Sequence, residues 1–187
     1  KERDWEKAVK IASQLEKISG VSFRKEISHY YCEMAVSMII SKKYSDGSKF
    51  LLQAIEEHKN CVRANILLGD VRESQGMIDE AISYWRKIEY QKPEYLGLVA
   101  SRIIKAYQAE GKINDGLSIL SRYYDLYNLR TLLNVLYEAV ISNEGPGSAE
   151  KIARNELIQR PSLLALDQLF QALAMNKNTQ IDNIELI

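Results

Sequence analysis

The sequence predicts an all-helical protein built from repeated antiparallel helix hairpins. Only three of its 187 residues are proline, and apolar residues recur at helical spacings of three and four with no sustained alternation of the kind strands show. The small residues that open each predicted second helix keep a steady spacing: Gly47, Ala81, Gly116 and Ala149 lie 34, 35 and 33 residues apart. Unrelated helices of varied length do not keep such a period, so the pattern favours a repeat architecture.

One unit carries a fuller signature of helix-turn-helix repeats of about 34 residues. Its members, in order, are Leu68, Gly69, Gly76, Ala81, Trp85 and Pro93. This order is typical of tetratricopeptide (TPR) repeats, which stack into a superhelical solenoid with a continuous core. Gly69 is expected to let its two helices approach closely, Trp85 to fill the space between neighbouring hairpins, and Pro93 to stop the second helix.

The other units depart from the signature where the glycine is expected. Ala35, Ile104 and Tyr137 replace it, and looser packing is expected in those hairpins. The whole chain, 1–187, is predicted to form a single TPR solenoid. Its predicted parts are the second helix of a truncated repeat at 1–20, repeats at 24–60, 62–94, 95–128 and 129–161, a terminal helix at 162–177 and a polar tail at 178–187.

Composition restricts the classes of partner. The chain has 25 basic and 25 acidic residues, so no global positive field favours nucleic acid or a phosphorylated lipid head group. Two cysteines are too few for a disulfide framework and indicate a reducing compartment. No apolar run is long enough to span a bilayer, so the chain is expected to be soluble, and its start at Lys1 within a helical pattern indicates an excised piece.

The predicted binding surface is the concave face, which the first helix of each hairpin lines. Positions two, five, nine and twelve of each repeat are expected to face inward there. The candidate partner-binding residues are His29, Cys32, Arg63, Ile66, Asp70, Glu73, Ser101, Lys105, Gln108, Thr131, Asn134 and Glu138. Apolar groups and charges of both signs in this set favour a protein or helical-peptide ligand.

Catalytic and metal sites are not predicted. No G-x-S-x-G elbow or glycine-rich phosphate loop is present, and the acidic residues stand at helix starts or on exposed faces. His29 with Cys32, and His58 with Cys61, each share a three-residue spacing. Two such ligands do not complete a tetrahedral zinc site, and nothing in the sequence brings the four together. We therefore expect no enzyme activity and no cofactor in this chain.

A ten-residue segment, Glu26 to Ala35, reads Glu-Ile-Ser-His-Tyr-Tyr-Cys-Glu-Met-Ala. It closely resembles a segment of the lipopolysaccharide assembly protein B family. Further matches in the same order extend the resemblance over most of the chain, at Trp5 to Ala8, Arg63, Leu68 to Asp70 and Gln159 to Pro161.

The resemblance implies a role beyond what periodicity indicates. Members of that family carry an N-terminal transmembrane helix, cytoplasmic repeats and a C-terminal rubredoxin-like zinc domain, and they limit lipopolysaccharide synthesis. They are thought to bring the lipid A deacetylase to a membrane AAA protease under the control of a lipopolysaccharide-sensing membrane regulator. This chain then corresponds to the repeat region at the cytoplasmic face of the bacterial inner membrane, with zinc expected only in a domain outside it.

Two other functions fit the same residues. A generic peptide-binding module of the co-chaperone kind would bind short C-terminal peptides and depend on Arg63, Lys105 and Asn134. A regulatory repeat arm of an enzyme would share the fold and lack chemistry of its own. Both alternatives keep the repeats as a binding surface, so they differ from the adaptor in the partner and not in the architecture.

Overall fold

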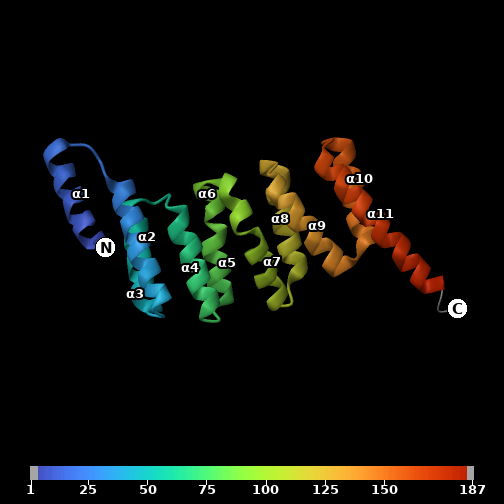
Figure 1. Ribbon diagram of the computed structural model, residues 1–187, viewed down its shortest axis with the longest axis horizontal. Coiled ribbons are helices and arrows are strands. Elements are labelled where there is room, and N and C mark those ends of the chain that lie inside the picture. The colour runs from blue at the N-terminus through green and yellow to red at the C-terminus, as the bar shows by residue number, and fades with distance from the viewer. Residues whose placement is uncertain (1–3, 185–187) are drawn as a thin grey trace. The chain divides into compact units, whose positions relative to one another are not determined.

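Helices follow one another through the part of the chain that the structure, a computed structural model, describes (Figure 1). The backbone is described for residues 4–184 and side chains for residues 4–176. The chain divides into two compact units, with the boundary between Val99 and Ala100. This boundary falls inside the predicted repeat 95–128, and the single continuous solenoid stays a prediction.

The described part of the first unit consists of one helix followed by three pairs of neighbouring elements. These elements are α1 (Trp5–Ser19), α2 (Arg24–Ile40), α3 (Tyr44–Glu57), α4 (Val62–Ser74), α5 (Ile78–Arg86), α6 (Ile88–Gln91) and the 3-10 helix η1 (Pro93–Leu98). Helices α2 and α3 pack as one hairpin and α4 and α5 as the next. Helix α1 lies against α2, where the Trp5 and Tyr30 rings stack with centroids 5.5 Å apart.

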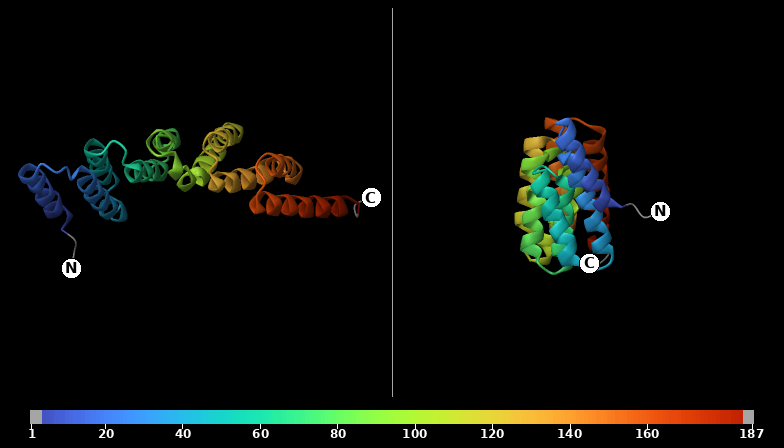
Figure 2. Two further views of the ribbon diagram at one scale, coloured as in Figure 1. Left: turned by 90° about the horizontal axis from the view of Figure 1, so that it is seen from above. Right: turned by 90° about the vertical axis from the view of Figure 1, so that its left-hand side faces the viewer.

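The described part of the second unit consists of two hairpins and a long final helix. These elements are α7 (Ala100–Ala109), α8 (Ile113–Tyr127), α9 (Arg130–Glu144), α10 (Pro146–Gln159) and α11 (Leu163–Ile184). Helix α11 packs along α10 and runs without a break (Figure 2). The predicted tail at 178–187 is therefore wrong as far as Ile184, since the helix continues past the predicted end at 177; residues 185–187 lie outside the described part.

The small residues that mark the repeat spacing occupy the same position in four helices. Gly47, Ala81, Gly116 and Ala149 are each the fourth residue of their helix, and all four are buried. A small residue one turn into the second helix lets that helix lie close to its partner. The all-helical repeat fold predicted from the sequence is confirmed.

Trp85 packs against the other helix of its own hairpin, and its predicted contact with the neighbouring hairpin stays a prediction. A Cβ atom built on Gly69 would lie 2.2 Å from Trp85 Nε1, so the indole packs directly on the glycine of its own hairpin. Its Nε1–H group donates toward the Ile66 carbonyl oxygen at 3.3 Å and toward Asp70 Oδ1 at 3.2 Å. Trp85 thus fills the space that Gly69 leaves within one hairpin, because the glycine has no side chain to occupy it.

Candidate functional site

A groove of about 580 Å³ runs across the first unit between α2, α4 and η1. We call it the basic groove. Its lining residues are Lys25, Ser28, His29, His58, Asn60, Cys61, Val62, Arg63, Ile66, Leu67, Lys92, Tyr95 and Leu98. The set contains several cationic and apolar side chains and not one aspartate or glutamate.

The chain after the α4–α5 hairpin forms one wall of the groove. Pro93 cannot continue a preceding helix, and the six residues that it begins adopt the 3-10 helix η1. Leu96 and Val99 are fully buried and anchor this segment, whereas Tyr95 is 41% and Leu98 57% exposed. Burial of one side of η1 therefore presents two large apolar side chains at the groove.

An ion pair joins the first helices of two successive hairpins beside the groove. Arg63 Nη1 on α4 donates to Glu33 Oε1 on α2 at 2.7 Å, and His29 Nε2 lies 3.6 Å from the same carboxylate oxygen. Arg63 Nη1 also lies 3.3 Å from His29 Nδ1. Glu33 thus offsets the charge of Arg63, and the positive rim of the groove comes from Lys25 and from Lys92, whose ammonium lies 5.8 Å from the centre of the Tyr95 ring.

Two thiols meet at the groove floor. Cys32 on α2 is fully buried, Cys61 immediately before α4 is half-buried, and their sulfur atoms lie 3.7 Å apart with no disulfide. The hydrogen bond with Cys61 and burial raise the pKa of Cys32. The same hydrogen bond is the main cause that lowers the pKa of Cys61 to about 5, with the Ala64 backbone N–H and His58 acting in the same direction. These opposite pKa directions favour the thiolate at Cys61 and the proton at Cys32.

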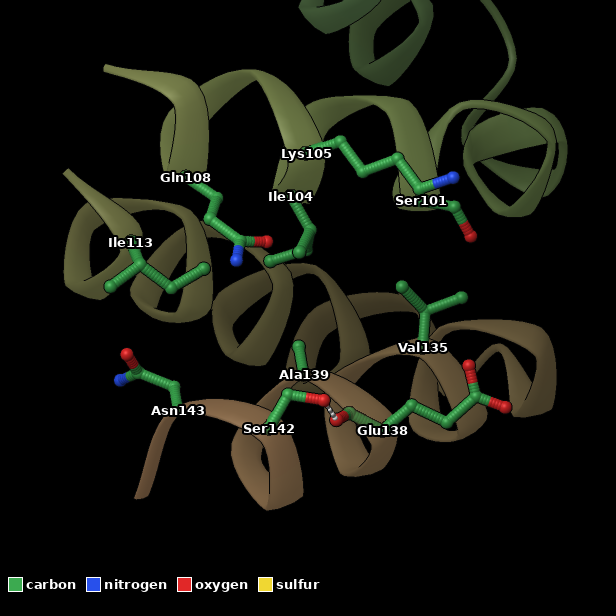
Figure 3. A pocket seen from close by; sticks show the side chains of 10 residues that line it. All are labelled: Ser101, Ile104, Lys105, Gln108, Ile113, Val135, Glu138, Ala139, Ser142 and Asn143. Carbon is green, nitrogen blue, oxygen red and sulfur yellow. Dashed lines mark hydrogen bonds between the residues drawn. The ribbon is translucent and has the colours of Figure 1, made fainter. Parts of the chain in front are cut away.

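A smaller cleft of about 200 Å³ lies in the second unit between α7 and α9 (Figure 3). Ile104 and Ala139 lie at its middle, and Lys105 and Glu138 stand near one end, with Ser101 and Val135 beside them. Gln108, Ile113 and Asn143 gather at the other end. This cleft carries both signs of charge, as the sequence predicted for the binding face, whereas the basic groove does not.

The predicted binding residues fall into separate groups in the structure. His29, Arg63 and Ile66 line the basic groove, and Ser101, Lys105, Gln108 and Glu138 line the smaller cleft. Their role in binding stays a prediction.

Five predicted residues do not line either hollow. Cys32 as a contact residue is wrong, because its side chain is fully buried in the core with Leu51 and Leu68. Asp70 accepts a hydrogen bond from Trp85, and Asn134 accepts one from Gln168 Nε2 on α11 at 2.9 Å, so both bind within the chain. Glu73 and Thr131 are exposed and lie outside both hollows.

Repeat positions identified only part of the remaining lining of the basic groove. Leu98 stands at the second, inward position of its repeat, whereas Lys25, Lys92 and Tyr95 lie outside the inward positions. The available signal was Pro93, whose fixed φ angle and missing N–H end a helix and start a new segment. The three-residue spacing of Tyr95 and Leu98 would have placed them on one face of that segment.

The four possible zinc ligands meet more closely than the sequence indicated. His29, His58 and Cys61 line the basic groove, and Cys32 lies beneath it. Among the described residues, however, no group of three or more His, Cys, Asp or Glu side chains is placed to hold a metal ion. The described helices also include none with the length and apolar character that crossing a membrane requires.

Known proteins resemble the chain in sequence. The chain is similar to lipopolysaccharide assembly protein B. The Haemophilus influenzae protein of that name is 25% identical over 171 residues, 91% of this chain, and the Escherichia coli K12 protein is 23% identical over 166 residues, 89% of this chain. The resemblance noted in the sequence is thereby confirmed. The chain spans 43% of the length of these relatives, and no protein-family model matches it.

Solved structures support the fold. A Podosopora anserina putative kinesin light chain with nearly identical TPR-like repeats superposes with a TM-score of 0.51 at 14% identity, over 89% of this chain and 93% of that one. The Cut9–Hcn1 assembly of the APC/C gives a TM-score of 0.50 at 17% identity, over 90% of this chain and 33% of that one. The fold is therefore of the TPR type.

Proposed function

We propose that the chain is the repeat region of a non-catalytic adaptor and that its basic groove holds an acidic, apolar-anchored segment of a partner protein. One observation carries the proposal: the groove presents the exposed side chains of Tyr95 and Leu98 beside Lys25 and Lys92, with no acidic residue in its lining. Aromatic and aliphatic anchors supply most of the energy of such interfaces, and complementary charge at the rim sets partner choice and association rate.

The resemblance to lipopolysaccharide assembly protein B supplies the biological setting of this proposal. The adaptor would link the lipid A deacetylase to a membrane AAA protease and so regulate lipopolysaccharide synthesis by proteolysis. A lipopolysaccharide-sensing membrane regulator would restrain it at the cytoplasmic face of the inner membrane. The relatives extend well beyond the matched region, so other parts of the whole protein would contribute membrane attachment and zinc binding.

A capture experiment with charge-reversed variants tests the groove. The chain is immobilised and challenged with the purified lipid A deacetylase and with the cytoplasmic part of the protease. The test variant is Lys25→Glu with Lys92→Glu, at the groove rim. The matched control is Lys7→Glu with Lys10→Glu, which makes the same charge change at exposed lysines of the same unit outside the groove.

We expect the native chain and the control to capture at least one of the two proteins, and the groove variant to lose that capture. Equal capture by both variants would show that the groove is not the contact surface. Failure of the native chain to capture either protein would refute the adaptor assignment for these repeats. Binding of short C-terminal peptides in place of both proteins would favour the peptide-binding alternative.

A further inference from the structure

The thiol pair is not used by partner binding, and its surroundings have a chemistry of their own. Cys61 precedes the first turn of α4, where the N–H groups at the start of a helix of 13 residues stabilise a thiolate. The Cys32 sulfur lies 3.7 Å from the Cys61 sulfur, at the distance of a thiol–thiolate hydrogen bond. Cys61 lies in the lining of the basic groove, so a molecule in the groove can reach its sulfur.

The groove selects among small reactants by charge. Lys25 and Lys92 line the cavity that contains Cys61, and no carboxylate shares the lining. A volume of about 580 Å³ matches the size of small-molecule sites. A reactant with carboxylate groups is drawn toward this sulfur, and a cationic reactant is repelled.

We propose that Cys61 is a site of S-thiolation by anionic low-molecular-weight disulfides of the glutathione class, and that Cys32 converts the adduct into a disulfide joining α2 to the start of α4. The proposal rests on two sulfur atoms from successive hairpins lying in contact, one of them open to a cationic groove. It does not rest on the proposed partner binding, and the two would use the same groove.

The reaction proceeds by two thiol–disulfide exchanges. The Cys61 thiolate attacks one sulfur of the small disulfide, forms the mixed disulfide and releases the other half as a thiolate. Cys32 then loses its proton to water, and its sulfur attacks the Cys61 sulfur and expels the second half. The protein dithiol loses two electrons, and the small disulfide gains them as it becomes two thiols.

The first exchange prepares the second. Before thiolation, the Cys32 proton is held by its hydrogen bond to the Cys61 thiolate. Thiolation removes that negative charge, so the proton on Cys32 is released more easily. The two sulfur atoms must then approach from 3.7 Å to the bonded length of about 2.05 Å. Cys61 precedes the first turn of α4, which leaves its side chain free of the helix interior.

Mass spectrometry after incubation with oxidised glutathione tests the site. We expect the native protein to pass through a species carrying one glutathione and to end two hydrogens lighter, with Cys32 and Cys61 in one cross-linked peptide. Cys32→Ala should stop at the mixed disulfide on Cys61, and Cys61→Ser should gain nothing. Glutathione on Cys32 in the Cys61→Ser variant, or no cross-link in the native protein, would overturn the proposal.

A second comparison tests the role of the groove without touching either thiol. We expect Lys25→Gln with Lys92→Gln to slow thiolation by oxidised glutathione roughly tenfold, the lower end of the range for electrostatic steering. The same variant should react faster than the native protein with cystamine, a cationic disulfide. Lys7→Gln with Lys10→Gln is the matched control and should change neither rate. A groove variant that slows both reagents equally, or neither, would refute charge selection.

Discussion

The α4–α5 and α7–α8 hairpins solve one packing problem in two ways. In the first, Gly69 stands opposite the fully buried Trp85. In the second, Ile104 and Leu120 occupy the equivalent positions, both of them buried. A large side chain on one helix needs a small partner on the other, whereas two medium side chains share the space. Helices α7 and α8 are packed less extensively than α4 and α5, and Ile104 lines the cleft beside them.

The remaining hairpins show that the larger side chain of the pair can lie on either the first or the second helix. Ala35 corresponds to Leu51 in the α2–α3 hairpin, and Tyr137 to Ala153 in the α9–α10 hairpin; all four side chains are buried. A larger residue on the first helix thus coincides with a smaller one on the second. The looser packing expected at Ala35 is wrong for the α2–α3 hairpin, whose helices pack closely. The looser packing expected at Ile104 agrees with the less extensive packing of α7 against α8.

Among the variants that test this comparison, removal of the Trp85 indole should lower the free energy of unfolding most. Trp85→Ala leaves Gly69 without a partner and opens a cavity that two helices cannot close, so we expect a loss of about 3–5 kcal/mol in the free energy of unfolding. Urea unfolding followed by fluorescence measures it, since the remaining tryptophan, Trp5, lies in the same unit. A loss well under that range would mean that the indole is not the main filler of the hairpin.

Truncation of the medium-sized partner should cost less. Ile104→Ala removes three carbons beside a cleft that lets neighbouring side chains relax, so we expect a loss of about 2–3 kcal/mol, the low end for such changes. Urea unfolding followed by circular dichroism measures it, because both tryptophans lie in the first unit. A cost equal to that of Trp85→Ala would contradict the difference between the two hairpins.

Addition of one methyl group at Gly69 should destabilise its hairpin, the opposite of the usual effect of a Gly→Ala change in a helix. An ordinary Gly→Ala change in a helix stabilises it by up to about 1 kcal/mol. Gly69→Ala instead drives its Cβ into the Trp85 ring, and we expect a net loss of about 1–2 kcal/mol in the free energy of unfolding, measured with urea. The control is the same change in a Trp85→Leu background, where it should become neutral or stabilising. A loss that persists there would point to a cause other than the indole.

The smallest effect should come from the ion pair that joins the hairpins beside the basic groove. The Arg63 and Glu33 side chains are 40% and 25% exposed, and solvent weakens such pairs to about 1 kcal/mol or less. We expect Arg63→Gln to lower the free energy of unfolding by no more than that and to leave helix content, followed by circular dichroism, unchanged. A larger loss would show that the pair, and not apolar packing, holds α2 against α4.

Local residue patterns were sufficient to predict the helical repeats, because the buried face of a helix carries apolar residues at a spacing of three and four. Gly47, Ala81, Gly116 and Ala149 therefore predicted four second helices, each of which begins three residues before its marker. The end of α11 was missed because polar residues continue a helix without an apolar pattern. The contact between Trp85 and Gly69 was not foreseen, because a repeat signature identifies a core position without specifying which residue packs against it.

The candidate site was less accessible to sequence reasoning. His29, Arg63 and Ile66, which repeat position predicts to face a partner, line the basic groove, but Cys32 was placed on a surface when it belongs to the core. Neighbouring positions on a first helix differ in exposure according to how the next hairpin lies against it. The sequence specifies that a position faces inward, without specifying whether that inward face is a groove or a packed contact.

The sequence by itself determined the helical repeat, its period and the resemblance to known proteins, since these depend on residues close together in the chain. Only the tertiary structure decided where charge and reactive groups gather. A net charge of zero gave no sign of a groove without acidic residues, and Cys32 and Cys61, 29 positions apart, meet only because two hairpins pack side by side. Such groupings arise from the angle and depth at which helices pack, which the spacing of residues along one helix does not encode.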